Sequence, residues 1–260
     1  MCSRGLGGAV RLAIAHLKVD VNAPNIDGDT PLHSATWRGH VDVVRNLTSF
    51  PVVDVNALDS DGDTPLHVAA YKGFNDVVCH LTLLQSVNVT AANNAGNTPL
   101  HYAARFGHMD VVFHLTSLPA IDVIARNNDG NTPLHFAAWA GHMDVVVHLT
   151  SLPAVDVIIM NKYGNTPMHN AVVGGHMGVV MHLTTLPVVN LNAKNIYGRT
   201  ALHLAAYRGR MEVARHLTSL PAVDVNAKNK YGDTPLQVAA ERRHIDVVRH
   251  LTSLQVVDVM

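Results

Sequence analysis

The sequence predicts an all-α repeat solenoid, in which helix–turn–helix units with short β-hairpin-like loops stack on one another. Three observations predict this fold class. A threonine recurs every 34 residues, residues that favour a helix start follow each threonine, and two short apolar stripes at helical spacing come next. An internal period of this length is typical of repeat proteins and excludes an ordinary globular domain.

The recurring threonines stand in one register, with no insertion between units. Proline follows each of them except the sixth, where Ala201 takes its place. The threonines are Thr30, Thr64, Thr98, Thr132, Thr166, Thr200 and Thr234. The predicted units are a partial repeat or cap at 1–21, repeats 1 to 6 at 22–55, 56–89, 90–123, 124–157, 158–191 and 192–225, and a seventh repeat with a C-terminal cap at 226–260.

The fourth unit illustrates how the first helix of a repeat is predicted. Thr132 is a favourable N-cap, because its hydroxyl can satisfy a backbone N–H that has no partner within the helix. Pro133 suits the first helical position, where no N–H is needed. Leu134 and Ala137 lie on one helical face, and Gly141 permits the left-handed conformation that ends a helix.

A second helix is predicted over residues 143–152 of the same unit. Val145, Val146 and Leu149 form its apolar face, and Pro153 stops it. Asp-Gly or Tyr-Gly before the next threonine predicts a tight turn. Two helices of about eight residues cannot bury an apolar face alone, so the units must stack to form a core.

The motif Thr-Pro-Leu-His-x-Ala, which recurs at residues 64–69, 98–103 and 132–137, resembles the ankyrin repeat. Gly-His after the first helix and Asp-Val-Asn before the next unit strengthen the resemblance, which extends from about residue 19 to residue 258. The family period is usually about 33 residues; the extra residue here falls after the second helix and predicts a longer loop. In the last unit Glu241, Arg242 and Arg243 make the first helix polar, as suits an outer cap.

Composition limits the classes of partner. Net charge is −1 with 15% charged residues, which argues against nucleic acid as the main partner. Two cysteines cannot form a disulfide framework, so we expect a reducing compartment, the cytoplasm or the nucleus. No apolar run has the roughly 18 residues of a membrane-spanning helix, so no membrane insertion is predicted. We expect a monomer.

The 18 histidines suggest a metal site, but 17 of them fall into three columns of the repeat. The ankyrin resemblance implies that the Thr-Pro-Leu-His and Gly-His columns are structural. The third column, in the second helix, is predicted to be a partly exposed stripe that could respond to acid pH. Zinc needs ligands that converge, whereas these columns spread along the stack. An Asp-rich segment at 59–63 is similar to a calcium loop, but it lacks the bidentate Glu. We predict no metal, no cofactor and no catalytic residue.

The positions outside the repeat pattern are the candidates for partner binding, because the resemblance places them on the concave face and the hairpin tips. Aromatic and arginine side chains, which often anchor interfaces, gather at the ends of the first helices and beside the turn glycines. The alternative is that these rings only shield neighbouring repeats. The predicted partner-binding residues are Trp37, Arg38, Tyr71, Lys72, Arg105, Phe106, Trp139, Tyr163, Tyr197, Arg199, Tyr207, Arg208 and Tyr231. Tyr102 and Phe136 could join them.

Charge and glycine content differ along the chain. The early hairpin tips carry Asp27, Asp29, Asp59, Asp61, Asp63 and Asp129. The later part carries Lys162, Lys194, Arg199, Arg208, Lys228, Lys230 and Arg242. Such a gradient would orient a complementary partner. The fifth unit has two extra glycines, Gly174 and Gly178, around the standard Gly175, which predicts that the chain opens most easily near residues 170–182.

The sequence therefore predicts a non-catalytic scaffold that binds another protein. An alternative is a regulatory ankyrin segment of a larger enzyme or channel. The resemblance also suggests that Asn56, Asn192 and Asn226 could be substrates of asparagine hydroxylation.

Overall fold

The computed structural model describes residues 19–254, and their helices come in pairs joined by short turns. The chain is an all-α repeat fold, as the sequence predicts. The described helices are α2 (Pro31–Trp37), α3 (Val41–Thr48), α4 (Pro65–Lys72), α5 (Asn75–Thr82), α6 (Pro99–Phe106), α7 (Met109–Thr116), α8 (Pro133–Ala140), α9 (Met143–Ser151), α10 (Pro167–Gly174), α11 (Met177–Thr185), α12 (Ala201–Arg208), α13 (Met211–Thr218), α14 (Pro235–Glu241) and α15 (Ile245–Thr252). The second helix of the fourth repeat ends one residue earlier than predicted.

The predicted threonine caps begin the first helices. At α4, Thr64 has extended backbone angles and its hydroxyl accepts a hydrogen bond from the His67 backbone N–H. A second hydrogen bond joins the same two residues, in which Nδ1 of the His67 ring accepts from the Thr64 N–H at 3.1 Å. This reciprocal arrangement is a capping box built with histidine in place of glutamate, and it satisfies two N–H groups at the helix start.

A glycine in the left-handed region ends most first helices, and the next repeat packs against it. Gly107 has φ +71°, and a Cβ added there would lie 2.3 Å from Nδ1 of His142. Only glycine therefore fits at this position. In the last repeat the equivalent residue is Arg243, which adopts φ 59°. The sequence analysis assigned Arg243 only to a polar cap and did not recognise this substitution.

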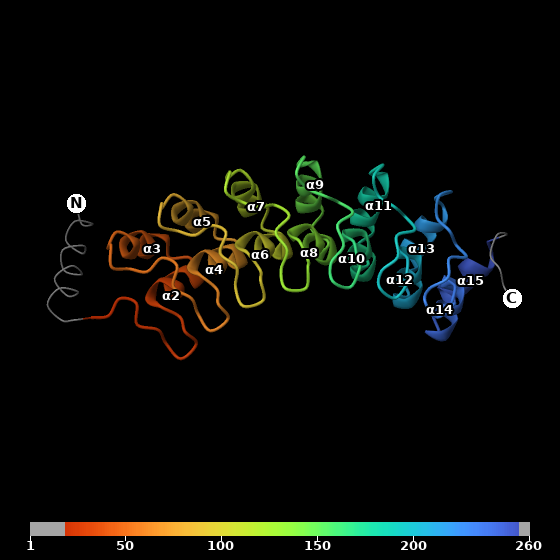
Figure 1. Cartoon of the computed structure of the whole chain (residues 1–260), viewed down its shortest axis with the longest axis horizontal. Helices are drawn as coiled ribbons and strands as arrows, with labels where there is room; N and C mark the ends of the chain where they lie inside the picture. The colour runs from red at the N-terminus through yellow and green to blue at the C-terminus, as the bar shows by residue number, and fades with distance from the viewer. Residues whose placement is uncertain (1–18, 255–260) are drawn as a thin grey trace. The chain divides into compact units, whose positions relative to one another are not determined.

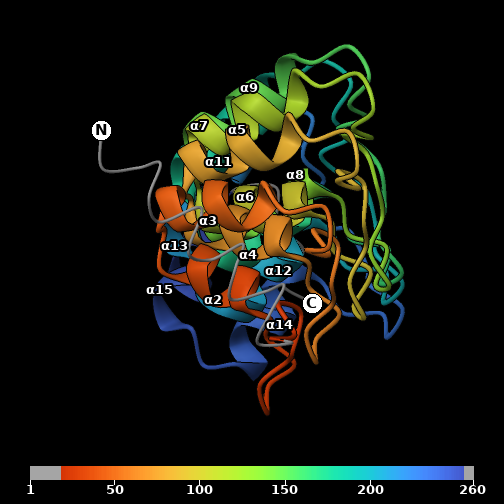
Figure 2. The same ribbon diagram turned by 90° about the vertical axis from the view of Figure 1, so that its left-hand side faces the viewer.

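The chain comprises two compact units. Unit 1 contains the residues up to Ala103 together with Asp110–Asp122, and unit 2 contains Ala104–Met109 and the residues from Val123 onward. In unit 1, α2 packs on α4 and α3 packs on α5 (Figures 1 and 2).

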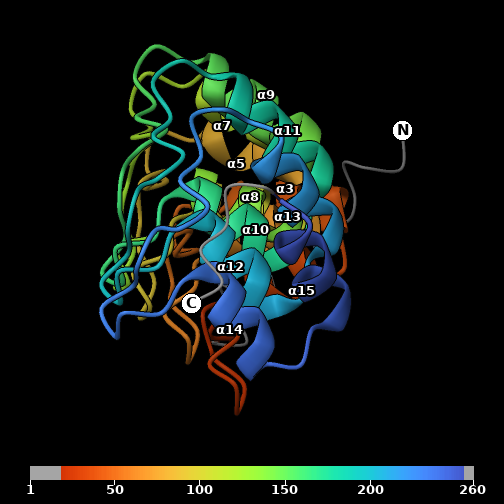
Figure 3. The ribbon, with the colours of Figure 1, turned by 90° about the vertical axis from the view of Figure 1, so that its right-hand side faces the viewer.

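Unit 2 repeats this arrangement with more helices. The first helices α8, α10, α12 and α14 form one row, and the second helices α9, α11, α13 and α15 form another (Figures 1 and 3). Helices α6 and α7 each contribute residues to both units.

The core of each unit consists of the residues that the repeat keeps apolar. Leu134 of α8 is 1% exposed, and Val145 and Leu149 of α9 are fully buried. The alanine pairs of the first helices, such as Ala137 and Ala138, are also fully buried, and their small side chains let neighbouring helices approach.

The loops before each threonine are hairpin-like turns stabilised by an asparagine or aspartate. Asn161 Oδ1 accepts from the Tyr163 and Asn165 N–H groups, and the Asn161 N–H donates to the Asn165 carbonyl. Consecutive tips are linked through the backbone, for example from the Lys162 N–H to the Asp129 carbonyl at 2.8 Å. These links hold the tips in a row beside the first helices.

The third histidine column connects consecutive second helices. In five described repeats a histidine Nε2 lies between 2.7 and 2.9 Å from a threonine Oγ1 of the preceding repeat. Thr184 illustrates the polarity of the bond, because its hydroxyl donates to the Met181 carbonyl and so accepts from His216. Burial and the neighbouring Arg45 lower the pKa of His80, the first of the column. These histidines are half-buried, and their inter-repeat bonds were not predicted.

The predicted partial repeat at 1–21 lies almost wholly outside the described residues. Val43 of α3 is 47% exposed, whereas its equivalents Val77 and Val111 are buried.

None of the described helices combines the length and apolar character that a membrane crossing needs.

Candidate functional site

The predicted partner-binding residues lie on two kinds of element. Trp37 and Trp139 lie in the last turns of first helices, together with the predicted residues beside them in the sequence. Tyr163, Tyr197 and Tyr231 lie at the hairpin tips. Trp37 is 51% and Trp139 is 47% exposed, although both are large apolar side chains. Exposed rings of this size are candidates for binding because water solvates them poorly.

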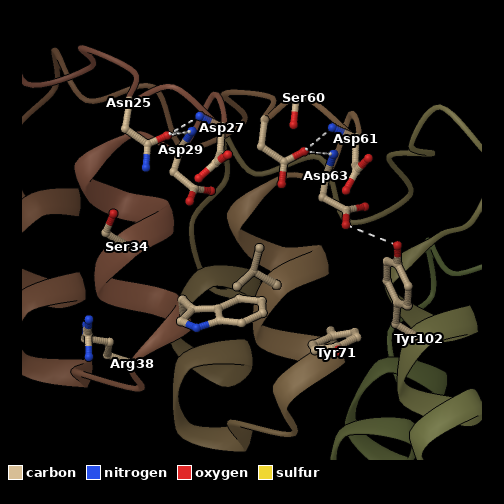
Figure 4. Close-up of a pocket in the computed structure, with 13 residues that line it drawn as sticks. Asn25, Asp27, Asp29, Ser34, Arg38, Ser60, Asp61, Asp63, Tyr71 and Tyr102 are labelled. Carbon is tan, nitrogen blue, oxygen red and sulfur yellow. Dashed lines mark hydrogen bonds between the residues drawn. The ribbon is translucent and has the colours of Figure 1, made fainter.

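Unit 1 contains a groove of about 660 Å³ between the hairpin tips and the first helices. Helices α2, α4 and α6 provide one wall, and the tips of two consecutive hairpins provide the other (Figure 4). Its lining residues are Asn25, Asp27, Asp29, Ser34, Trp37, Arg38, Asp59, Ser60, Asp61, Asp63, Val68, Tyr71 and Tyr102.

The helix wall of this groove is a row of aromatic rings. Trp37 stacks on Tyr71 with ring centroids 5.8 Å apart, and Tyr71 meets Tyr102 edge-on at 5.7 Å. Nζ of Lys72 lies 3.5 Å from the centre of the Trp37 ring, a cation–π contact. The structure thus brings Trp37, Tyr71 and Lys72 together, as well as Tyr102, which the sequence analysis named only as a possible addition.

The hairpin wall is acidic. Five aspartates line it, and within the described residues no lysine or arginine forms an ion pair with any of them. Figure 4 shows Asp27, Asp61 and Asp63 on the side of the groove opposite Tyr71. Burial raises the pKa of Asp63 to about 6, against hydrogen bonds from Asn93 Nδ2 at 2.7 Å and the Tyr102 hydroxyl at 3.1 Å.

Unit 2 has a smaller hollow of about 260 Å³ in the equivalent place. Its lining includes Arg105, Phe136, Trp139 and Tyr163. The Arg105 guanidinium lies 5.6 Å from the Phe136 ring centre and 5.9 Å from that of Trp139. An arginine placed between two aromatic side chains is typical of an interface anchor.

Phe106 is predicted to bind a partner together with Trp37 and Trp139, but it stands at a different position in the repeat. The position equivalent to Trp37 in the third repeat is Arg105, seven residues after Thr98, and Phe106 lies one residue further on. Phe106 stacks on His108 with centroids 6.4 Å apart and does not line either hollow. A shift of one residue turns a helical side chain by about 100°.

The later repeats of unit 2 present a basic aromatic cluster. The guanidinium groups of Arg199 and Arg242 lie 4.8 and 4.1 Å from the ring centre of Tyr207, and that of Arg208 lies 5.8 Å away. Arg199 also lies 5.6 Å from the Tyr197 ring centre. Tyr197, Arg199, Tyr207 and Arg208 are therefore neighbours, whereas Tyr231 extends into solvent and is 69% exposed.

The residues that could suggest a metal site have structural contacts in the described part of the chain. No three His, Cys, Asp or Glu side chains between residues 19 and 254 are grouped to hold a metal ion. In the Asp-rich segment at 59–63, Asp59 Oδ1 accepts from the N–H groups of Asp61 and Asp63 and so serves the turn. Cys79 is a half-buried thiol on α5, 3.8 Å from Asn75 Oδ1.

Both structural histidine columns link one repeat to the next. His67 Nε2 lies 2.9 Å from the Asn97 carbonyl oxygen, and His142 Nε2 lies 3.0 Å from that of Arg105. Two repeats have another residue at the second-column position. Phe74 packs on Gly39 there, and Arg210 donates to the Val173 carbonyl.

The side chains of Asn56 and Asn192 join loops of consecutive repeats, and their hydroxylation stays a prediction.

Comparison with known proteins decides the family. A family model for ankyrin repeats, in three copies, matches overlapping segments at residues 1–91, 49–127, 80–157, 118–195, 134–229 and 178–259. The chain belongs to the ankyrin repeat family.

Among solved structures, this ankyrin repeat protein is similar to the ankyrin repeat domain of Bcl-3, a member of the IkappaB protein family. The two share 32% sequence identity with a TM-score of 0.69, over 86% of this chain and 99% of that one. No curated protein sequence matches the chain.

A second exposed apolar surface, on the second-helix side, was not predicted from the sequence. In unit 2, Met143, Val147 and Met181 are all at least 40% exposed. The signal was present in the sequence for two of them, since Val147 and Met181 stand where other repeats have Arg45, Arg215 and Arg249. This surface is the main alternative to the hollows as a candidate binding site.

Proposed function

We propose that this ankyrin repeat protein is a non-catalytic interaction module. In this proposal a partner protein binds in the hollows that the first helices and hairpin tips form within each unit. The observation that carries the proposal is the row of half-exposed aromatic and arginine side chains in the hollows of both units. Large rings held by a rigid scaffold lose little conformational entropy on binding, which makes them effective anchors.

Two features support a binding role over a catalytic one. The histidines of the first two columns are occupied by inter-repeat contacts. Two of the polar groups in the hollows serve their own turns, since Asp59 Oδ1 and Asn161 Oδ1 each accept backbone N–H groups of the same hairpin. Two cysteines are too few for a disulfide framework, which supports action in the cytoplasm or nucleus.

The test is affinity capture of partners from the native cell with two matched variants. One carries Trp139→Ala, Tyr163→Ala and Tyr197→Ala on the groove side of unit 2. The other carries Met143→Ala, Val147→Ala and Met181→Ala on the second-helix side, where the exposed fractions are similar. Urea unfolding of both variants checks that the repeats remain folded.

We expect the groove variant to lose captured partners by at least about tenfold, because interface aromatics commonly contribute 2 kcal/mol or more. The second-helix variant should retain them. Equal capture by the groove variant and the unmodified chain, both folded, would contradict the proposal.

A further inference from the structure

The groove of unit 1 differs from the hollow of unit 2 in its charge. Its helix wall carries the rings of Trp37, Tyr71 and Tyr102, and its hairpin wall carries five aspartates. Asp27 and Asp61 are exposed at the hairpin tips, whereas Asp29, Asp59 and Asp63 are half-buried. Arg38 is the one cationic residue of the lining, and Lys72 lies on the Trp37 ring beside it, so the groove has a formal charge close to −3 in its ionised state.

The aromatic wall already binds an ammonium group within the molecule. Lys72 Nζ lies 3.5 Å from the ring centre of Trp37 and 5.5 Å from that of Tyr71. An electron-rich ring face attracts a cation most when a carboxylate lies within reach of the same cation. This contact is independent of the aspartates and shows which chemistry the rings accept.

Lysine and arginine side chains match both walls at once. Their methylene stems pack on aromatic rings while their charged heads reach carboxylates, and the arginine guanidinium can also stack on a ring. An acidic or phosphorylated segment would meet repulsion from the hairpin wall, and a purely apolar segment would leave several carboxylates desolvated without a partner.

We propose that the groove of unit 1 binds a lysine- or arginine-rich segment of the partner protein. This inference rests on the proposed function and specifies the chemistry of the partner at one of its surfaces. Asp63 favours the same occupant. The raised pKa of Asp63 reflects burial without a cationic neighbour, and a bound ammonium would supply one.

A single metal ion is a poorer match for this groove. Asp59 Oδ1 accepts two backbone N–H groups of its own turn, and Asp63 accepts from Asn93 and Tyr102. The free carboxylates Asp27 and Asp61 belong to different hairpins, and within the described chain they form no group suited to a metal. A long basic segment can contact them one after another.

The test is fluorescence anisotropy of labelled peptides titrated with the full chain. The probes are a peptide of alternating lysine and glycine, its arginine counterpart, and a matched peptide with glutamine in place of the basic residue. We expect saturable binding of both basic peptides, none of the glutamine peptide, and weaker binding as salt is added, because salt screens the charges.

Two charge-matched variants assign the site. Asp27→Asn with Asp61→Asn removes two groove carboxylates that make no side-chain hydrogen bond within the described residues. Asp76→Asn with Asp110→Asn removes the same charge from the second helices α5 and α7. The groove pair should weaken the lysine peptide by about tenfold, and the second-helix pair should change its affinity by less than about twofold.

Three outcomes would overturn the inference: no saturable binding of the basic peptides, equal weakening by both variant pairs, or association of the chain with itself through the groove. The last would appear as a sedimentation coefficient that rises with concentration and is reduced by the groove pair. If the peptides fail while the aromatic variant of unit 2 still loses its partners, the basic-segment inference is wrong and the proposed function stands.

Discussion

The histidine of the Thr-Pro-Leu-His motif bonds to two repeats, and its protonation state follows from its partners. His67 Nδ1 faces the Thr64 N–H, which can only donate, so Nδ1 carries a lone pair. The proton therefore lies on Nε2 and is donated to the Asn97 carbonyl. Burial lowers the pKa of His67 to about 4, and the pKa of His169 falls to about 4 for the same reason.

The fold should therefore lose stability in acid. A histidine whose pKa is lower in the folded state contributes stability above its unfolded value, about 6.5, and loses it as the pH falls towards 4. His67 alone contributes about 3 kcal/mol over this window. Asp63 acts in the opposite direction on the free energy of unfolding. Its pKa is raised to about 6 in the folded state, so the folded chain takes up this proton more readily than the unfolded chain and gains stability as the pH falls through 6. Urea unfolding at pH 7 and pH 5 measures the net effect, which we expect to be destabilisation in acid.

The last repeat provides a natural control for this prediction. Gln237 replaces the histidine there, and its Oε1 accepts from the Thr234 N–H at 2.8 Å. His67→Gln should keep the helix cap but lose the bond to Asn97, at a cost of about 1 kcal/mol at pH 7. Its stability should change less between pH 7 and pH 5 than that of the unmodified chain. An unchanged pH dependence would show that His67 does not contribute to it.

Arg243 occupies a backbone conformation that elsewhere in the described repeats belongs to glycine. Its φ of 59° lies in the left-handed region, where a side chain costs about 1 to 2 kcal/mol. Arg243→Gly should raise the free energy of unfolding by about 1 kcal/mol, after the greater entropy of glycine in the unfolded chain is subtracted. Chemical denaturation measures this change; no stabilisation, or a loss, would contradict the strain.

The two extra glycines of the fifth repeat, Gly174 and Gly178, have different roles, although the same cost was predicted for both. A Cβ at Gly174 would lie 2.5 Å from the Trp139 carbonyl oxygen, so the close approach of α10 to α8 needs glycine there. Gly178 is inside α11 and has nothing within 4 Å of the added Cβ. Only Gly178 is a conformational cost without a packing benefit.

Alanine substitutions separate these two roles. Gly178→Ala should stabilise the chain by about 1 kcal/mol, because alanine favours a helix interior. Gly174→Ala should destabilise it, because backbone must shift to admit the methyl group. Hydrogen exchange of residues 170–182 would follow local opening, which Gly178→Ala should slow. Exchange that is the same in this segment as in the neighbouring repeats would contradict the predicted softness of the fifth repeat.

The helices could be predicted from the sequence because their signals are local. Each threonine, proline and glycine acts on the backbone within a few residues, so helix ends came within a residue or so of their positions. The contacts between repeats were harder to predict, because they depend on the rotation of each helix. Tyr102, for example, joins the unit 1 groove across 39 residues of sequence from Asp63. The place of Arg105 at the ring position of the third repeat, in contrast, follows from the 34-residue register.

The surface of the molecule offers two candidate binding sides. Within each unit the groove side carries rings and arginine, with an acidic wall in unit 1, whereas the second-helix side of unit 2 carries Met143, Val147 and Met181. Both sides expose apolar area, so exposure alone does not distinguish them. The groove side is favoured because it combines apolar anchors with oriented charge, which gives an interface both affinity and specificity.

Site-specific photo-crosslinking in the native cell tests this choice most directly. A photoreactive phenylalanine analogue replaces Tyr163 or Tyr197 at the hairpin tips, or Val147 or Met181 on the second helices. The account predicts that the same partner protein is crosslinked from both hairpin positions and from neither second-helix position. Crosslinks from Val147 and Met181, with none from Tyr163 and Tyr197, would place the partner on the opposite side and contradict the central claim.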